Sequence, residues 1–245
     1  MNHALEISHL ECRYPDGTHA LRGLNLSLEE GSCMGLVGPN GAGKTTLALL
    51  LAGFLEPSAG TIRFFGAELN QHTKAKARAD IGFIFPNPDD QLFMPTVLED
   101  VSFGLLCAGA KMEEAATRAR AMLDQLELGA VASKFPGHLS SGQKRLAALA
   151  GVLVMKPRIL VLDEPTAFLD PFARRQVISI LKQLPQARLI ITHDLELVLE
   201  LCDTVELISE GKDMARGQPR QLFEDERLMK QNRLEMPASL VKGSR

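Results

Sequence analysis

The sequence predicts an α/β fold with a central, mostly parallel sheet, an antiparallel β edge subdomain and a helical subdomain. An apolar run at residues 32–37 leads into a glycine-rich loop at 38–45 and then a helix-like run, the strand–loop–helix order of a phosphate site. Residues 158–162 and 188–191 are continuously apolar after the arginine that begins each, which is typical of strands covered on both faces in a parallel sheet. The segment 96–155 has mostly helical patterns, whereas the patterns near both ends of the chain are those of short strands.

The composition bounds the domain organisation and the function classes. With 245 residues and 45% hydrophobic content, the chain suits one large α/β domain with subdomains or two small domains. We expect a single domain over 1–245, with a helical subdomain at about 96–155 and a helical tail at about 219–245. A net charge of −3 argues against nucleic acid as a partner. No apolar run approaches the ~18 residues that span a bilayer, and the N-terminus lacks the layout of a signal peptide.

Several scattered side chains are interpreted as structural. The four cysteines are far apart and are expected to be buried small hydrophobes in a reducing compartment. They are Cys12, Cys33, Cys107 and Cys202. The basic cluster Lys74, Lys76 and Arg78 is interpreted as a solvated helix face. The histidines near the N-terminus fit no ligand spacing and are interpreted as incidental surface residues, with metal handling as the alternative. They are His3, His9 and His19.

The first third of the chain is expected to form short strands. Residues 5–13 and 24–28 have strand patterns, with a turn at 15–17 between them. After the helix that follows the glycine-rich loop, residues 61–65 and 81–85 are further expected strands. Two prolines directly after the last of these stop it.

The middle of the chain is expected to be helical. Thr96 and Glu99 fit a capping box at the start of a helix that runs to about Ala108. Residues 113–128 have apolar positions at helical spacing, which predicts an amphipathic helix. Those positions are Ala116, Ala119, Leu123 and Leu126. Ser140 is expected to cap a further helix that ends near Met155.

The last third alternates helices and strands. A helix is expected at 171–183, between the two apolar strands, and another at 195–201. A strand at 204–209 and a last helix at 219–230 follow.

The glycine-rich loop fits the phosphate-binding pattern G-x-x-x-x-G-K-[ST]. Its residues are Gly38, Pro39, Asn40, Gly41, Ala42, Gly43, Lys44 and Thr45. The glycines allow backbone N–H groups to point at phosphate oxygens, and the helix N-terminus adds partial positive charge. Lys44 is expected to reach the β- and γ-phosphates, and the Thr45 hydroxyl is expected to bind Mg²⁺. The alternative is a glycine-rich turn that binds nothing.

Two carboxylates, Asp163 and Glu164, end the apolar strand at 158–162, at the sheet edge where α/β proteins place their ligands. Asp163 is suited to hold the Mg²⁺ water shell, and Glu164 to orient or deprotonate an attacking water. We expect Glu164 to point away from Asp163 because side chains alternate along a strand. The alternative is a solvated strand end with two acids.

Two weaker signals accompany these motifs. Residues Ser140, Ser141, Gly142 and Gln143 place a hydroxyl cap and a glycine at a helix N-terminus, which is an anion site or a plain cap. His193 follows the strand at 188–191 and is suited to hydrogen-bond a γ-phosphate oxygen, although a lone histidine there is more often structural.

In this order the motifs resemble the ATP-binding-cassette (ABC) ATPases over nearly the whole chain, which implies a phosphate-loop NTPase core. Residues 85–93 and 95–104 resemble the ATPase subunits of energy-coupling-factor importers, which include cobalt and nickel uptake ATPases and vitamin importers. The segment at 150–157 resembles them too. The resemblance implies ATP and Mg²⁺ as cofactors, and it places Tyr14 in the position that stacks on adenine.

The resemblance also implies a mechanism. Two ATPase chains, identical or different, sandwich two ATP molecules, so that the phosphate loop and Thr46 of one chain face residues 140–143 of the other. Glu164 acts on the water, His193 senses the γ-phosphate, and Asp170 communicates across the dimer. An integral membrane coupling protein, working with a solute-binding membrane component, docks near residues 86–91. The chain is then a peripheral protein at the cytoplasmic face of the membrane.

Three positions depart from the family pattern. Pro86 replaces the usual glutamine, which ligates Mg²⁺ and relays the nucleotide state to the membrane partner. We therefore expect slow or weakly coupled hydrolysis. Ser141 stands where glycine is commonest, with strain expected only if its φ is positive. Leu146 stands where a basic residue is usual, with Arg145 one position away.

Two alternatives remain at this point. One is a catalytically weak or regulatory ABC subunit paired with a distinct active ATPase, which Pro86 motivates. The other is a soluble ABC ATPase outside transport, acting on DNA or ribosomes. Such proteins usually carry coiled-coil insertions, tandem cassettes or strong basic patches, and this sequence has none of them.

Overall fold

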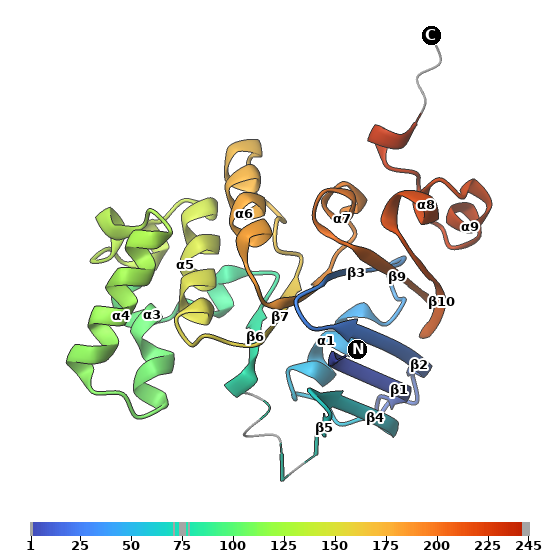
Figure 1. The fold of residues 1–245 in the computed structure, drawn as a ribbon, viewed down its shortest axis with the longest axis horizontal. Helices are drawn as coiled ribbons and strands as arrows, with labels where there is room; N and C mark the ends of the chain where they lie inside the picture. The colour runs from blue at the N-terminus through green and yellow to red at the C-terminus, as the bar shows by residue number, and fades with distance from the viewer. Residues whose placement is uncertain (1, 71, 74–76, 78, 242–245) are drawn as a thin grey trace. The chain divides into compact units, whose positions relative to one another are not determined.

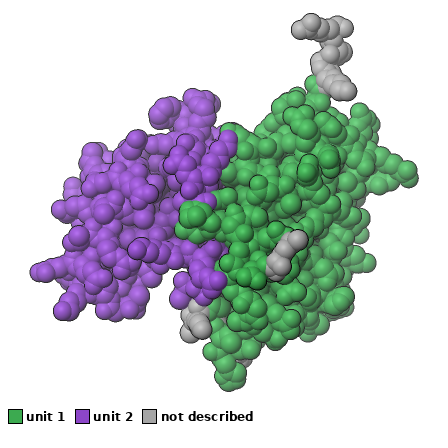
Figure 2. Space-filling view, in the orientation of Figure 1, with its two compact units in different colours: residues 1–78, 185–245 green, residues 79–184 purple. Residues whose placement is uncertain are grey.

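The computed structural model describes residues 2–70, 72, 73, 77 and 79–241. The cluster Lys74, Lys76 and Arg78 lies outside the described residues. By its internal contacts the chain forms two compact units, coloured separately in Figure 2. The first unit comprises residues 1–78 and 185–245, and the second comprises residues 79–184.

The first unit begins with an antiparallel sheet in the strand order β2-β1-β4-β5 (Figure 1). Its strands are β1 (His3–Arg13), β2 (His19–Glu29), β4 (Ala59–Phe64) and β5 (Ala67–Glu68). β2 starts at His19, five residues before the predicted start at residue 24, because the pairing with β1 continues past a series of bulges to Arg13 and His19. Inward-facing residues of β1, such as Leu5, Ile7 and Leu10, are buried, so the sheet has one apolar face.

The same unit contains the strand order β10-β9-β3-β8. These strands are β3 (Cys33–Val37), β8 (Ala187–Ile191), β9 (Thr204–Ser209) and β10 (Lys212–Gly217). β3 runs parallel to both β8 and β9, and β10 returns antiparallel to β9. Every residue of β3 and β8 is buried, which the apolar character of both segments predicts for all of them except Arg188. The mostly parallel α/β core is thereby confirmed for this unit.

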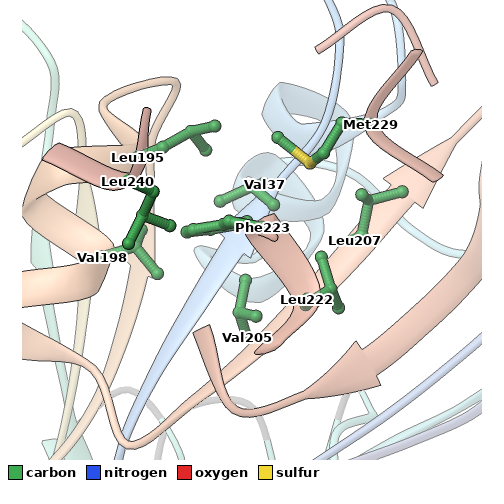
Figure 3. Packing of buried hydrophobic residues seen from close by; sticks show 9 residues of the cluster. All are labelled: Val37, Leu195, Val198, Val205, Leu207, Leu222, Phe223, Met229 and Leu240. Carbon is green, nitrogen blue, oxygen red and sulfur yellow. The ribbon is translucent and has the colours of Figure 1, made fainter. Parts of the chain in front are cut away.

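Helices α7 (Leu195–Leu201), α8 (Pro219–Phe223) and α9 (Glu226–Gln231) close a core over these strands. Figure 3 shows the nine side chains of this core, in which Phe223 packs with residues from the strands and from the other helices. The members are Val37, Leu195, Val198, Val205, Leu207, Leu222, Phe223, Met229 and Leu240. The single helix predicted at 219–230 is wrong, because the Asp225 carboxylate accepts the Leu228 N–H at 2.9 Å and starts a second helix.

The second unit contains the parallel pair β6 (Ile81–Ile84) and β7 (Ile159–Asp163). Its helices are α3 (Val97–Cys107), α4 (Met112–Gln125), α5 (Ser141–Leu153) and α6 (Pro171–Gln183). The first unit also contains α1 (Lys44–Leu51), which follows the phosphate loop. α3 packs against α4 and α5, and α5 packs against α6. One-turn 3₁₀ helices lie at Pro88–Asp90, Gly129–Val131 and Pro136–His138, and another at Ala238–Leu240 in the first unit.

Three local expectations for the helices need correction. The helix predicted at 113–128 ends at Gln125, because Glu127 takes a positive φ of 60°. Ala115 is buried instead of Ala116, whereas Ala119 and Leu123 are buried as predicted. At α3, Glu99 accepts a hydrogen bond from the Thr96 hydroxyl at 2.8 Å instead of from the Thr96 backbone, so only half of the capping box forms.

The cysteines are all free thiols, but their burial differs. Cys12 and Cys33 are buried, whereas Cys107 is exposed, so the prediction of four buried cysteines is wrong there. Cys202 is partly buried, and its Sγ lies 3.7 Å from that of Cys33. Within the described ranges, no helix has the length and apolar character needed to cross a membrane.

Candidate functional site

The phosphate loop connects β3 to α1 in the first unit, and its backbone requires glycine at two positions. Gly38 has φ 157°, and a Cβ there would lie 2.1 Å from the Ile208 carbonyl oxygen. Gly43 has φ 104°, and its Cβ would lie 2.8 Å from the Ala20 oxygen. Both contacts are shorter than any side chain tolerates, so the loop is held closely against the neighbouring backbone.

Lys44 folds back over the loop that precedes it. Its ammonium donates to the carbonyl oxygens of Gly38 at 2.6 Å and Pro39 at 3.0 Å. Gly43 supplies no side-chain cap for α1, and the first turn of that helix holds no acidic residue. The positive end of α1 and a lysine ammonium therefore lie at the same loop, which is the chemistry of a phosphate site.

Tyr14 lies beside the start of α1 in the first unit. Its hydroxyl lies 3.1 Å from the Thr46 hydroxyl, which places the phenol beside the first turn of α1. Thr46 is buried, whereas Asn40, Gly41 and Thr45 are exposed. The ring proposed to stack on adenine is thus tied directly to the helix that follows the phosphate loop.

His193 emerges at the same end of the parallel strands as the phosphate loop. The Thr192 N–H donates to the Leu36 oxygen at 3.2 Å, so the residue before His193 pairs with the strand that enters the loop. The buried Thr192 accepts the Asp194 N–H at 3.0 Å, and Asp194 caps α7 through Leu197 at 2.9 Å. An exposed imidazole is thereby carried on a fixed backbone.

In the second unit, β7 ends at Asp163, which is 8% exposed. Glu164 has φ 48°, a left-handed conformation that costs about 1–2 kcal/mol in a non-glycine residue. Glu164 therefore lies outside the strand, and strand alternation does not set its side-chain direction; that it points away from Asp163 stays a prediction. Backbone strain of this kind gathers at functional sites, where the surrounding structure enforces it.

The turn at residues 140–143 starts α5 with a complete capping box. The Ser140 hydroxyl accepts the Gln143 N–H at 3.2 Å, and the Gln143 side chain accepts the Ser140 N–H at 3.1 Å. Ser141 is the first helical residue, so the strain considered for a positive φ does not arise. A Cβ at Gly142 would lie 2.6 Å from the Ala173 Cβ, so glycine permits α5 to approach α6 closely.

Asp170 caps α6 in the same unit. One of its carboxylate oxygens accepts the N–H groups of Phe172 at 2.8 Å and Ala173 at 3.0 Å. Asp170, which is predicted to communicate across the dimer, is therefore also the N-cap of α6, and these hydrogen bonds fix its carboxylate. Phe168 and Phe172 on either side of it are 91% and 71% exposed, so this turn presents apolar surface to solvent.

The loop after β6 contains Pro86, and its backbone is held by two side chains to which the sequence analysis gave no such role. Gln91 accepts the Phe85 N–H at 2.9 Å and donates to the Phe83 oxygen at 3.0 Å. Arg145, 2% exposed, donates to the Phe85 and Pro86 oxygens. The signal for Arg145 was present in the sequence, as an arginine among the apolar positions of an expected helix.

Burial lowers the pKa of Arg145, and the negative charge of Asp163 opposes this effect. Leu146, the next residue, is also buried, in keeping with its apolar character. The guanidinium remains charged at any physiological pH, because arginine titrates far above that range. A buried positive charge therefore lies within electrostatic reach of Asp163 at the end of β7.

A glycine-rich loop between a strand and a helix, with a lysine directed at that loop, defines a phosphate-loop nucleotide-binding protein. Residues 21–167 match the family model described as ABC transporter, and the chain belongs to the ABC transporter family. It is accordingly an ATP-binding subunit and an ATPase whose hydrolysis of ATP is coupled to transport.

Three comparisons place it more closely. The chain is 42% identical to an energy-coupling factor transporter ATP-binding protein, EcfA, of Methanosphaera stadtmanae, over 97% of this chain and 87% of that protein. It is 41% identical to the EcfA of Methanococcus maripaludis, over 95% and 86% of the two chains. The solved structure of CbiO1 from Clostridium perfringens, part of the ABC transporter complex cbiONQ, superposes with a TM-score of 0.83 at 36% identity and covers 94% of both chains.

Proposed function

We propose that this ATPase powers an importer of the energy-coupling-factor type, for a transition-metal ion such as cobalt or nickel or for a vitamin. The proposal is supported by the EcfA and CbiO1 similarities, which extend over nearly the whole chain. Its partners are then an integral membrane coupling protein and a solute-binding membrane component. The chain works as a peripheral protein at the cytoplasmic face of the cell membrane, as one ABC ATPase domain over 1–245.

At the nucleotide, each residue has a proposed task. Lys44 and the loop N–H groups hold the β- and γ-phosphates, and Tyr14 stacks on the adenine. The hydroxyl of Thr45 and the carboxylate of Asp163 are hard oxygen donors of the kind that Mg²⁺ prefers. Bound Mg²⁺ would neutralise charge on the transferred phosphate. Glu164 orients or deprotonates the attacking water, and His193 donates to a γ-phosphate oxygen.

A second ATPase chain completes each site in this proposal. Its 140–143 turn places the N-terminus of α5 and the Ser140 hydroxyl against the triphosphate. Asp170 lies at the contact between the chains, and the apolar side chains beside it favour burial there. ATP then holds the two chains together, and its hydrolysis releases them.

The geometry of the phosphate loop is the observation that carries the nucleotide site. Replacing Lys44 with alanine removes the ammonium that faces the loop carbonyls. We expect Lys44→Ala to lower the ATPase rate by about 100-fold or more and to weaken MgATP binding. Lys230→Ala, at an exposed lysine on α9, is the matched control. Unchanged affinity and turnover in Lys44→Ala would refute the site.

The transport role has its own test. The tagged chain should co-purify with a small polytopic membrane protein, and vesicles that hold the complex should accumulate Co²⁺, Ni²⁺ or a labelled vitamin only when MgATP is present. A complex that hydrolyses ATP but moves none of these solutes would count against the importer assignment while leaving the ATPase intact.

Pro86 favours a second candidate, a catalytically weak or regulatory subunit that pairs with a distinct active ATPase. Proline supplies no side-chain oxygen at a position where the family usually has a metal ligand. Turnover by the isolated chain, abolished by Glu164→Gln, would exclude this candidate. A basal rate that Glu164→Gln leaves unchanged would favour it.

A further inference from the structure

Two basic residues directly after the 140–143 turn reach the loop that follows β6. Lys144 and Arg145 are on the first turns of α5, and the loop comprises residues 85–91 in the same unit. The Lys144 ammonium lies 2.7 Å from an Asp89 carboxylate oxygen. The Arg145 guanidinium donates from both terminal nitrogens to two consecutive carbonyl groups of the loop.

Arg145 makes the deeper of these two links. Nη1 donates to the Phe85 oxygen at 2.6 Å and Nη2 donates to the Pro86 oxygen. Its Nε is buried and has no hydrogen-bond partner among the described residues. Burying a charge with one unsatisfied donor lowers the stability of the folded state. The two hydrogen bonds to carbonyl groups are the contacts that offset this loss.

Lys144 makes the outer link to the same loop. Its side chain is 19% exposed and that of Asp89 is 56% exposed, so the pair lies at the surface. Asp89 belongs to the 3₁₀ turn at Pro88–Asp90, and its N–H donates to the Asn87 side chain at 3.1 Å. Asp89 is therefore fixed within the loop before the lysine contacts it.

The loop is also stiff within itself. The Gln91 side-chain amide bonds the backbone at Phe83 and Phe85, as a further strand residue would. With Gln91 closing it on one side and α5 holding it on the other, residues 85–91 have little freedom to move relative to the 140–143 turn.

We propose that Lys144 and Arg145 are positioning residues that make the 140–143 turn and the 85–91 loop move as one body. This proposal rests on the proposed function, in which the turn contacts the partner chain's ATP and the loop contacts the membrane component. Nucleotide binding at the turn is then transmitted to the docking loop through these side chains, without any contact between the loop and that nucleotide.

Hydrogen–deuterium exchange in the full-length chain tests this link. The hydrolysis-blocked variant Glu164→Gln is incubated with and without MgATP, and exchange is followed at the amides of residues 140–146 and 87–91. We expect MgATP to slow exchange in both segments, at 87–91 by about tenfold, which is within the usual range of coupling between sites. Adding Lys144→Glu should preserve the slowing at 140–146 and reduce that at 87–91 to less than about threefold.

Charge exchange separates a specific link from general damage. Combining Lys144→Asp with Asp89→Lys restores an ion pair of reversed direction and should restore the slowing at 87–91. Lys230→Glu, which reverses a lysine of another surface ion pair, is the matched control. The thermal unfolding temperature should be nearly the same in the reversed pair and the parent variant, because an ion pair at the protein surface contributes little stability in either direction.

The remaining outcomes overturn the role proposed for Lys144. Full slowing at 87–91 in Lys144→Glu would show that the lysine transmits nothing. Failure of the reversed pair to restore the effect would leave Lys144 with a structural role only. If MgATP slowed neither segment in the parent variant, the two-chain sandwich itself would fall, and the positioning proposal with it.

Discussion

At the scale of single residues, position 86 shows how the chain tolerates a departure from its family. Proline has no N–H to donate, and here none is needed, because the loop is held through the Phe85 N–H and the carbonyls of Phe85 and Pro86. What proline removes is a side-chain oxygen beside the proposed Mg²⁺. The backbone of the loop is therefore compatible with proline or glutamine at position 86. The two residues differ in whether the side chain supplies an oxygen that can bind Mg²⁺.

Pro86→Gln should consequently raise the ATPase rate. A restored metal contact of this kind changes activity by about 10-fold or more, and the loop contacts that fix the backbone are unaffected. Steady-state phosphate release at saturating MgATP measures the effect, with Pro88→Gln in the same loop as the control. Equal rates for Pro86→Gln and the parent chain would show that position 86 does not limit hydrolysis.

At the scale of elements, strand β9 buries a carboxylate. Glu206 is 4% exposed and pairs in register with Arg216 of β10. It lines a hollow of about 420 Å³ in the first unit, together with Glu6, Asp213 and Arg216. Burial raises the pKa of Glu206 from 4.5 to about 7, although the positive charge of Arg216 works in the opposite direction.

This strand should make the free energy of unfolding depend on pH. Because the folded-state pKa of Glu206 is raised, its stabilising contribution is complete below about pH 4.5 and is lost as pH rises to about 7. The loss amounts to about 3 kcal/mol at most, at 1.36 kcal/mol for each unit of pKa. Glu206→Gln should remove this part of the dependence, so that the variant gains stability relative to the parent between pH 5 and pH 8.

Urea unfolding at pH 5 and pH 8 measures the two free energies, and Glu29→Gln at an exposed position is the control. A pH dependence that is the same in Glu206→Gln and the parent chain would show that Glu206 titrates normally in the folded protein.

At the scale of the whole molecule, the proposed catalytic residues are divided between the two units. The phosphate loop and His193 belong to the first unit, whereas the 140–143 turn, Glu164 and Asp170 belong to the second. In the proposed two-chain arrangement, ATP is the ligand that brings the turn of one chain to the loop of the other. Association should therefore depend on nucleotide.

Glu164→Gln in the presence of MgATP should form a species of twice the 26.7 kDa chain mass, whereas without nucleotide it should not. Light scattering after size-exclusion chromatography reports the mass. The double variant Lys44→Ala, Glu164→Gln should stay monomeric under the same conditions. A parent variant that remains monomeric with MgATP would leave a heteromeric pairing with another ATPase as the arrangement to test.

The sequence by itself determined the class of fold, the phosphate loop and most helix boundaries. Those features depend on local rules: apolar runs for covered strands, glycine where φ is positive, and Thr96 and Ser140 as helix caps. Residues within a few positions of one another decide such features, so they can be predicted from one amino-acid sequence. The family resemblance rested on the same motifs and is confirmed by the comparisons.

Tertiary structure decided the features that depend on contacts between distant residues. Whether Ala115 or Ala116 is buried, which backbone conformation Glu164 takes, and how Arg145 reaches the Phe85 and Pro86 carbonyls all depend on contacts that form only in the folded chain. The pKa of Glu206 belongs to this group as well, because burial in the folded sheet sets it. Hydropathy patterns record whether a residue is apolar, but the partner that a buried polar group finds is fixed only when the chain has folded.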